Sequence, residues 1–139
     1  MTGTAVTPPE RFTLELPPDP AYVSAARLFA ATVARQVGVA EDLLDDIKMA
    51  VGEACARALA TAANRPLSVE VERSDRRVVF EVAQGKPSSA IPSHLTSTPT
   101  QQELAVGLNL ELITALFEDA DIVEGRGGTA VVRFSVPEL

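Results

Sequence analysis

The stretch Glu41–Ala63, EDLLDDIKMAVGEACARALATAA, predicts a long amphipathic helix in the middle of the 139-residue chain. Its apolar residues recur three and four positions apart, as one face of an α-helix requires. Acidic residues gather at its start, where the helix dipole favours negative charge. The apolar stripe comprises Leu43, Leu44, Ile47, Val51, Ala54, Cys55, Ala58 and Ala62. We expect the domain to be organised around this helix.

Two charged residues, Glu53 and Arg57, lie one helical turn apart on the flank of this stripe. At that spacing their side chains can form an ion pair at the edge of a core. A carboxylate in the middle of a half-buried helix also fits a second interpretation, in which Glu53 faces a ligand cleft. The spacing alone leaves both interpretations open.

Length and composition indicate one soluble globular domain, with 46% hydrophobic and 22% charged residues. We expect a flexible tail over residues 1–10 and a single domain over residues 11–139. A net charge of −7 with scattered arginines argues against direct nucleic-acid binding. The sequence contains no apolar run long enough to span a membrane and no leader segment, so we expect a cytoplasmic protein without a membrane partner.

The single cysteine and the single histidine give no basis for a metal site. Cys55 lies on the apolar stripe, where a small core residue in a reducing compartment is the simpler interpretation. His94 lies in a loop rich in proline, serine and threonine, with no other histidine or cysteine near it in sequence. We therefore predict no metal ligands from these residue types.

Before the central stretch, alternating apolar residues predict a strand over Phe12–Leu16. A helix is expected over residues 21–37, with Asp19 as its cap, Pro20 at its first position and Gly38 at its end. Its expected inner face comprises Tyr22, Ala26, Phe29, Val33 and Val37.

After the central stretch, alternating runs over residues 67–72 and 77–82 predict an antiparallel hairpin with Ser74–Asp75 as its turn. Residues 84–102 contain prolines and hydroxyls without an apolar period, as in a functional lid or a linker. A short helix over 107–117 and a hairpin of residues 121–124 and 130–136, turned by GRGG, complete the chain. The expected inner face of that short helix comprises Leu108, Leu112, Ile113 and Leu116. This order predicts an α+β two-layer sandwich, with a mostly antiparallel sheet and helices on one face.

Three runs in this order resemble the GHKL superfamily of ATPase domains, and within it the bacterial anti-sigma-factor serine/threonine kinases. AVGEACARA at 50–58 is similar to the family's AVxEAxxNA, GLNLELI at 107–113 to GLGLxLI, and Gly127–Thr129 to GGT. The resemblance extends from Phe12 to Val136 and implies the Bergerat (GHKL-type) ATPase fold. It also implies a nucleotide site, with Glu53 at the general-base position. The corresponding cofactor-binding positions are Arg57, Gly85, Gly107, Asn109, Gly128 and Thr129.

Three departures from the family pattern affect nucleotide chemistry. Arg57 replaces the asparagine that ligates Mg²⁺, and a guanidinium has no acceptor atom and repels the cation. The aspartate that accepts from adenine falls on Ala83 or Gln84, and Asn109 replaces a glycine beside the phosphates. We therefore expect ATP and Mg²⁺ binding to be weak or absent. An Arg57–Glu53 pair would also depress the basicity of the carboxylate. In the alternative, Arg57 replaces the metal by binding phosphate directly.

The resemblance implies a regulator that binds a sigma factor and a STAS-domain anti-anti-sigma protein and forms a homodimer. Because the motifs are degenerate, we expect function by protein binding with ATP turnover lost or weakened. In the family the first helix contacts partners, and Arg27 and Arg35 lie on it in this chain. The alternatives are an active serine/threonine kinase that phosphorylates a STAS-domain partner, and a sensor that holds an anion against Arg57.

Overall fold

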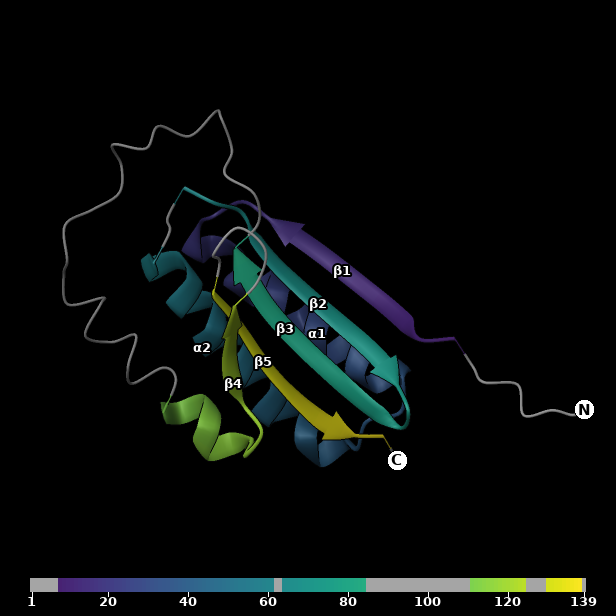
Figure 1. Ribbon diagram of the computed structural model, residues 1–139. Helices are drawn as coiled ribbons and strands as arrows, with labels where there is room; N and C mark the ends of the chain where they lie inside the picture. The colour runs from purple at the N-terminus through teal and green to yellow at the C-terminus, as the bar shows by residue number, and fades with distance from the viewer. Residues whose placement is uncertain (1–7, 62–63, 85–110, 125–129, 139) are drawn as a thin grey trace, which may run out of the picture.

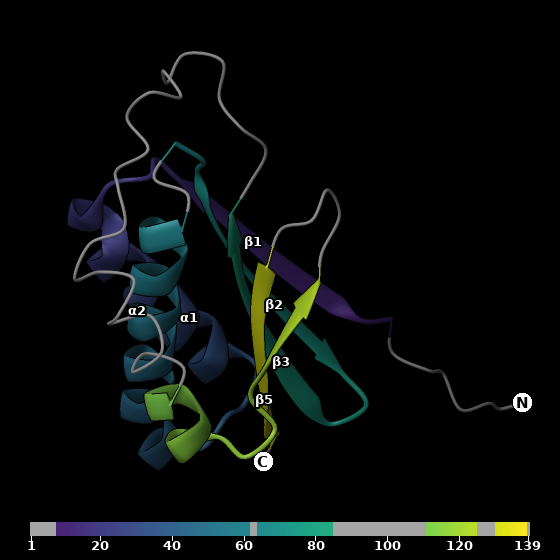
Figure 2. The ribbon, with the colours of Figure 1, turned by 60° about the vertical axis from the view of Figure 1, so that its left-hand side comes forward.

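The computed structural model describes residues 8–61, 64–84, 111–124 and 130–138. These residues form an antiparallel five-stranded sheet, with helices packed against one of its faces (Figures 1 and 2). The strand order is β1-β2-β3-β5-β4. The strands are β1 (Glu10–Leu16), β2 (Leu67–Ser74), β3 (Arg77–Gln84), β4 (Asp121–Glu124) and β5 (Ala130–Pro137). This arrangement confirms the predicted two-layer α+β fold.

The helical layer contains α1 (Val23–Gln36) and α2 (Leu44–Thr61), each preceded by a 3₁₀ turn, η1 (Pro20–Tyr22) and η2 (Glu41–Leu43). The Asp19 carboxylate accepts a hydrogen bond from the Ala21 N–H at 2.9 Å, which confirms the predicted cap. Gly38 follows α1 with a φ of +91°, a value that favours glycine. A further helical segment, 111–116, lies beside α2 in both views of the ribbon. No helix within the described ranges is long and apolar enough to cross a membrane.

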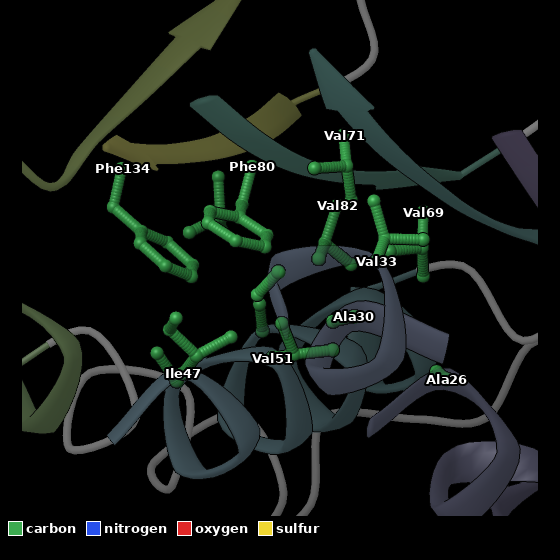
Figure 3. Close-up of a cluster of buried hydrophobic side chains, with 14 of the residues drawn as sticks. Ala26, Ala30, Val33, Ile47, Val51, Val69, Val71, Phe80, Val82 and Phe134 are labelled. Carbon is green, nitrogen blue, oxygen red and sulfur yellow. The ribbon is translucent and has the colours of Figure 1, made fainter. Parts of the chain in front are cut away.

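The core lies between the sheet and the two long helices (Figure 3). Phe80 and Phe134 extend from the sheet toward Ile47 and Val51 of α2, and their rings stack with centroids 5.0 Å apart. Phe117 stacks on Phe134 at 4.6 Å, which joins the segment after residue 116 to the same cluster. The buried α2 residues are Leu44, Ile47, Ala50, Val51, Ala54, Cys55 and Ala58. They confirm the predicted stripe, except for Ala62, which lies outside the described residues, and Leu43, which is only partly buried.

Two residues predicted to face inward are exposed instead. Tyr22 is 42% exposed because it ends a 3₁₀ turn and precedes α1, so it does not continue the inner face of α1. Leu112 is 46% exposed because segment 111–116 turns Ile113 and Leu116 toward the core. Leu112 cannot face the core as well, because adjacent residues of an α-helix lie about 100° apart around its axis. The inward predictions for Ala26, Val33, Val37 and Ile113 are confirmed, and those for Phe29 and Leu116 hold for partly buried side chains.

The turn between β2 and β3 differs by one residue from the prediction. Ser74 pairs with Arg77, so the two-residue loop is Asp75–Arg76 rather than Ser74–Asp75. Both loop residues have positive φ angles, 54° and 64°, as a type I′ turn requires. This turn matches the twist of the flanking strands, which outweighs the unfavourable conformation of Arg76.

Candidate functional site

The predicted catalytic flank of α2 carries Glu53 and Arg57, and both side chains are half-buried. They lie between the buried stripe and the exposed face of the helix, on which Met49 and Ala56 are exposed. Burial lowers the pKa of the Arg57 guanidinium from its ordinary value. A permanent positive charge is therefore held in a partly desolvated position on this flank. The direct Glu53–Arg57 pair stays a prediction.

The end of β3 reaches the C-terminal half of the same helix. The side-chain amide of Gln84 donates a hydrogen bond from Nε2 to the carbonyl oxygen of Ala58 at 2.5 Å. Ala58 directly follows Arg57, so this bond fixes the strand end beside the predicted site. Gln84 and Ala83 are the two positions at which the family's adenine-reading aspartate was expected. Alanine has no side-chain acceptor, and the Gln84 amide nitrogen is used as a helix–sheet link.

A groove on the outer face of α1 and α2 was not predicted from the sequence. It encloses about 530 Å³ and extends along α2 to Glu53. The stem of Arg27 lies against Gly52, since a Cβ atom added at Gly52 would stand 3.1 Å from Arg27 Cδ. Its lining residues are Val23, Arg27, Asp45, Lys48, Met49, Gly52 and Glu53. The available signal was Gly52 itself, because an interior helical glycine often marks a close approach.

Several predicted site residues lie outside the described residues. Five of them fall in the gaps between the described ranges: Gly85, Gly107, Asn109, Gly128 and Thr129. Residues 85–102 of the predicted lid segment also lie in such a gap. The structure places Glu53 and Arg57 on one flank of α2 and brings the end of β3 to the carbonyl of Ala58, next to Arg57. The nucleotide roles of the other positions stay predictions.

The described residues do not fit a magnesium ion at this flank. Mg²⁺ requires oxygen ligands in nearly octahedral geometry, and Arg57 supplies a positive charge and only N–H donors at the expected ligand position. Within the described ranges, no group of three or more His, Cys, Asp or Glu residues could hold a metal ion. Glu53 alone would leave the cation beside a fixed guanidinium.

Comparison with known proteins places the chain among a recognised class of domains. Residues 16–135 match the family model for the histidine kinase-like ATPase domain. The chain is also similar to proteins named serine-protein kinase RsbW from Bacillus cereus (strain G9842), Bacillus mycoides (strain KBAB4) and Bacillus anthracis. In each case 27% of residues are identical over 135 residues, covering 88% of this chain and 83% of the relative.

Proposed function

The chain belongs to the family of histidine kinase-like ATPase domains, and on that premise we propose that it is an anti-sigma-factor-like regulator of a bacterial partner-switching system. It acts by protein binding, with ATP turnover lost or weakened. Its partners are a sigma factor, a STAS-domain anti-anti-sigma protein, or both in competition, and it works as a homodimer in the cytoplasm. The similarity to serine-protein kinases over 88% of the chain supports the regulatory setting.

The observation that carries the loss of turnover is the half-buried guanidinium of Arg57. Phosphoryl transfer depends on placing the phosphates and neutralising them with metal ions. At Arg57 a fixed cation occupies the position at which the family's metal ligand is expected. Glu53 at the general-base position contributes little without a positioned nucleotide.

The outer surface of the first long helix supports a protein-binding role. Leu28 on α1 is 66% exposed and Met49 on α2 is 48% exposed, which leaves apolar area available for a partner. Arg27 lines the groove between these helices and can pair with an acidic partner group. Arg35, by contrast, already pairs with Glu41 of its own chain at 3.2 Å.

The alternative function is an active, ATP-dependent serine/threonine kinase that phosphorylates a STAS-domain partner. It is favoured by Glu53, whose half-buried carboxylate lies on the flank of α2 where the family's general base is expected. It requires ATP to bind despite Arg57 and Gln84. Metal-independent binding of a phosphate group against Arg57 would instead identify an anion sensor.

Calorimetric titration with ATP, with and without Mg²⁺, separates these functions. We expect no heat of binding at micromolar concentrations in either condition, while the Bacillus cereus relative serves as the positive control. Micromolar, metal-dependent binding would overturn the loss of turnover and establish the kinase. Binding of equal strength with and without Mg²⁺ would establish that Arg57 binds the phosphate directly.

Protein binding is tested by co-purification of sigma factors and STAS-domain proteins with the tagged full chain. We expect Arg27→Ala to reduce capture and Arg35→Ala to leave it unchanged, because only Arg27 lines the groove. Capture of neither protein class by the wild-type chain would contradict the regulatory role. Equal loss with both variants would contradict the placement of the partner on this groove.

A further inference from the structure

Gly52 lies in the middle of α2, and its backbone conformation does not require a glycine. The helix extends for 18 residues from Leu44 to Thr61. Gly38, after α1, has a φ of +91°, whereas Gly52 is not among the described residues with positive φ. A glycine in a helix interior also destabilises the helix relative to alanine, because it loses more backbone freedom on folding. The reason for this glycine must therefore lie in the space around it.

The space beside Gly52 is filled by the side chain of Arg27 from α1. A Cβ atom added at Gly52 would stand 3.1 Å from Cδ of Arg27, and 3.6 Å from both its Cγ and its Nε. These three consecutive atoms are the nearest ones to such a Cβ outside the adjoining part of α2. The stem of Arg27 therefore crosses α2 at a residue that carries no side chain.

The contact beside Gly52 is made by a side chain and not by the backbone of α1. The buried side of α1 carries small residues, and Ala26, Ala30 and Ala34 are fully buried there. Gly52 is only half-buried, and the atoms nearest to it belong to the exposed Arg27. An interior helical glycine often marks a close approach, and here it is the approach of one arginine.

The guanidinium of Arg27 forms no ion pair or hydrogen bond within the described part of the chain. Arg35 on the same helix differs, because Glu41 accepts two hydrogen bonds from it, at 3.2 and 3.3 Å. Arg27 instead lines the groove that extends along α2 to Glu53. Its charge is available to an acidic group of a partner, and its stem is held by packing on Gly52.

We propose that Gly52 positions Arg27 for partner binding. The missing side chain at residue 52 lets the Arg27 stem lie across α2, with its guanidinium directed into the groove. An arginine whose stem is already packed loses less side-chain freedom when it pairs with a partner carboxylate. Gly52 is thus a positioning residue that acts on the partner through Arg27. This role rests on the proposed function, because the groove is taken as the partner site.

Thermal unfolding of four chains separates this role from one in helix packing. The chains are wild type, Gly52→Ala, Arg27→Ala and the double variant. We expect Gly52→Ala to raise the melting temperature by about 2–4 °C in the Arg27→Ala background, where alanine is the better helix former and the space is open. In the wild-type background the gain should be smaller, because the Arg27 stem must move. An equal gain in both backgrounds, or a loss in the Arg27→Ala background, would overturn the proposal.

The Nε–H signal of Arg27 in a ¹⁵N NMR spectrum reports the position of the stem without any partner. Its loss in Arg27→Lys assigns the signal. We expect the relaxation of an ordered side chain in wild type and that of a freely rotating one in Gly52→Ala. The Nε–H of Arg35, which bonds to Glu41 at 3.2 Å, is the internal control and should not change. An Arg27 signal that is identical in both chains would contradict the positioning role.

Partner binding tests the consequence for function. The probe is the sigma factor or STAS-domain protein that wild type captures on co-purification, and calorimetry with the full chain measures its dissociation constant. We expect about threefold weaker binding for Gly52→Ala, and no further weakening when Gly52→Ala is added to Arg27→Ala. Arg35→Ala provides the matched control, since Gly52→Ala should weaken binding equally with and without it.

Three binding results would overturn the proposal in different ways. Capture of neither protein class by wild type would remove the proposed function and with it the partner role of Gly52, while the NMR and unfolding results would still test the packing of Arg27. Undiminished binding by Gly52→Ala, together with a mobile Arg27 signal, would keep the proposed function and remove the role of Gly52. Further weakening on adding Gly52→Ala to Arg27→Ala would show that the partner contacts residue 52 directly.

Discussion

Arg57 on α2 and Arg73 on β2 are both half-buried, yet their surroundings differ. Arg73 pairs with Glu10 at 2.9 Å and with Glu138 at 2.7 Å, and these hydrogen bonds raise its pKa. At Arg57 the dominant influence is burial, which lowers the pKa. Arg73 thus links the first residue of β1 to the residue that follows β5. Burial, in contrast, disfavours the charged form of Arg57. Arg73 therefore serves the fold, whereas Arg57 lies on the flank of α2 where the resemblance predicts the nucleotide site.

The largest expected effect concerns the apolar packing between α2 and the sheet. Ile47→Ala removes a fully buried side chain that lies beneath the stacked phenylalanines. We expect a loss of about 2–5 kcal/mol in the free energy of unfolding, measured by urea denaturation. Met49→Ala, on the exposed face of the same helix, is the matched control and should cost less than about 1 kcal/mol. Equal losses would show that α2 is not packed as described.

The comparison itself is tested by replacing each arginine with methionine. Arg57→Met removes a half-buried charge whose pKa is lowered by burial and keeps an apolar stem, so we expect it to change the free energy of unfolding by less than about 1 kcal/mol. Arg73→Met leaves Glu10 and Glu138 without their cation and should lower stability. Urea denaturation of the two variants measures both effects. A larger loss for Arg57→Met than for Arg73→Met would reverse the assignment of roles.

A smaller, pH-dependent effect is expected at Glu138. The hydrogen bond from Arg73 is the main cause that lowers the pKa of this carboxyl below its ordinary value of 4.5. Its stabilising contribution is therefore present above pH 4.5 and lost as the pH falls through the lowered pKa. We expect Glu138→Gln to unfold at a lower temperature than wild type at pH 7, with the difference vanishing in acid.

Glu118→Gln is the control for this pH series, because Glu118 is exposed and has no ion-pair partner in the described part of the chain. Its melting temperature should follow that of wild type across the whole range. A Glu138→Gln deficit that persists unchanged at pH 3 would mean that the ion pair with Arg73 is not its source.

The last prediction is that a single substitution leaves ATP binding unchanged. Arg57→Asn restores the family's metal ligand, but the amide of Gln84 still bonds to the Ala58 carbonyl where a carboxylate is expected. We therefore expect Arg57→Asn to bind ATP with Mg²⁺ no better than wild type in a thermal-shift titration. The double variant Arg57→Asn with Gln84→Asp is the comparison that should bind more tightly. Strong binding by the single variant would show that Arg57 alone blocks the nucleotide.

The layers and most of the strands could be predicted from the sequence because burial imposes a simple period. On β2, Leu67, Val69 and Val71 alternate with polar residues, and all three are buried. The errors occur where a local conformation interrupts the period. The 3₁₀ turn before α1 displaced Tyr22, and the left-handed pair Asp75–Arg76 moved the hairpin turn by one residue.

The candidate site was less predictable, because its geometry depends on contacts between distant segments. The spacing of Glu53 and Arg57 placed them on one flank, but nothing local to Gln84 indicated that its amide would bond to a helix 26 residues earlier in the chain. The groove between α1 and α2 was missed for the same reason. Gly52 is the sequence feature that indicates this groove, but it can be interpreted only once Arg27 is known to lie against it.

The burial of Cys55 has a practical consequence. Its thiol is fully buried in the hydrophobic core, and burial raises its pKa to about 12. At pH 8 almost no thiolate exists in the native protein, so alkylating reagents can label Cys55 only while the core around it is open. Pulse labelling followed by mass spectrometry would then record how often the core around Cys55 opens, with no dye or engineered probe attached to the chain.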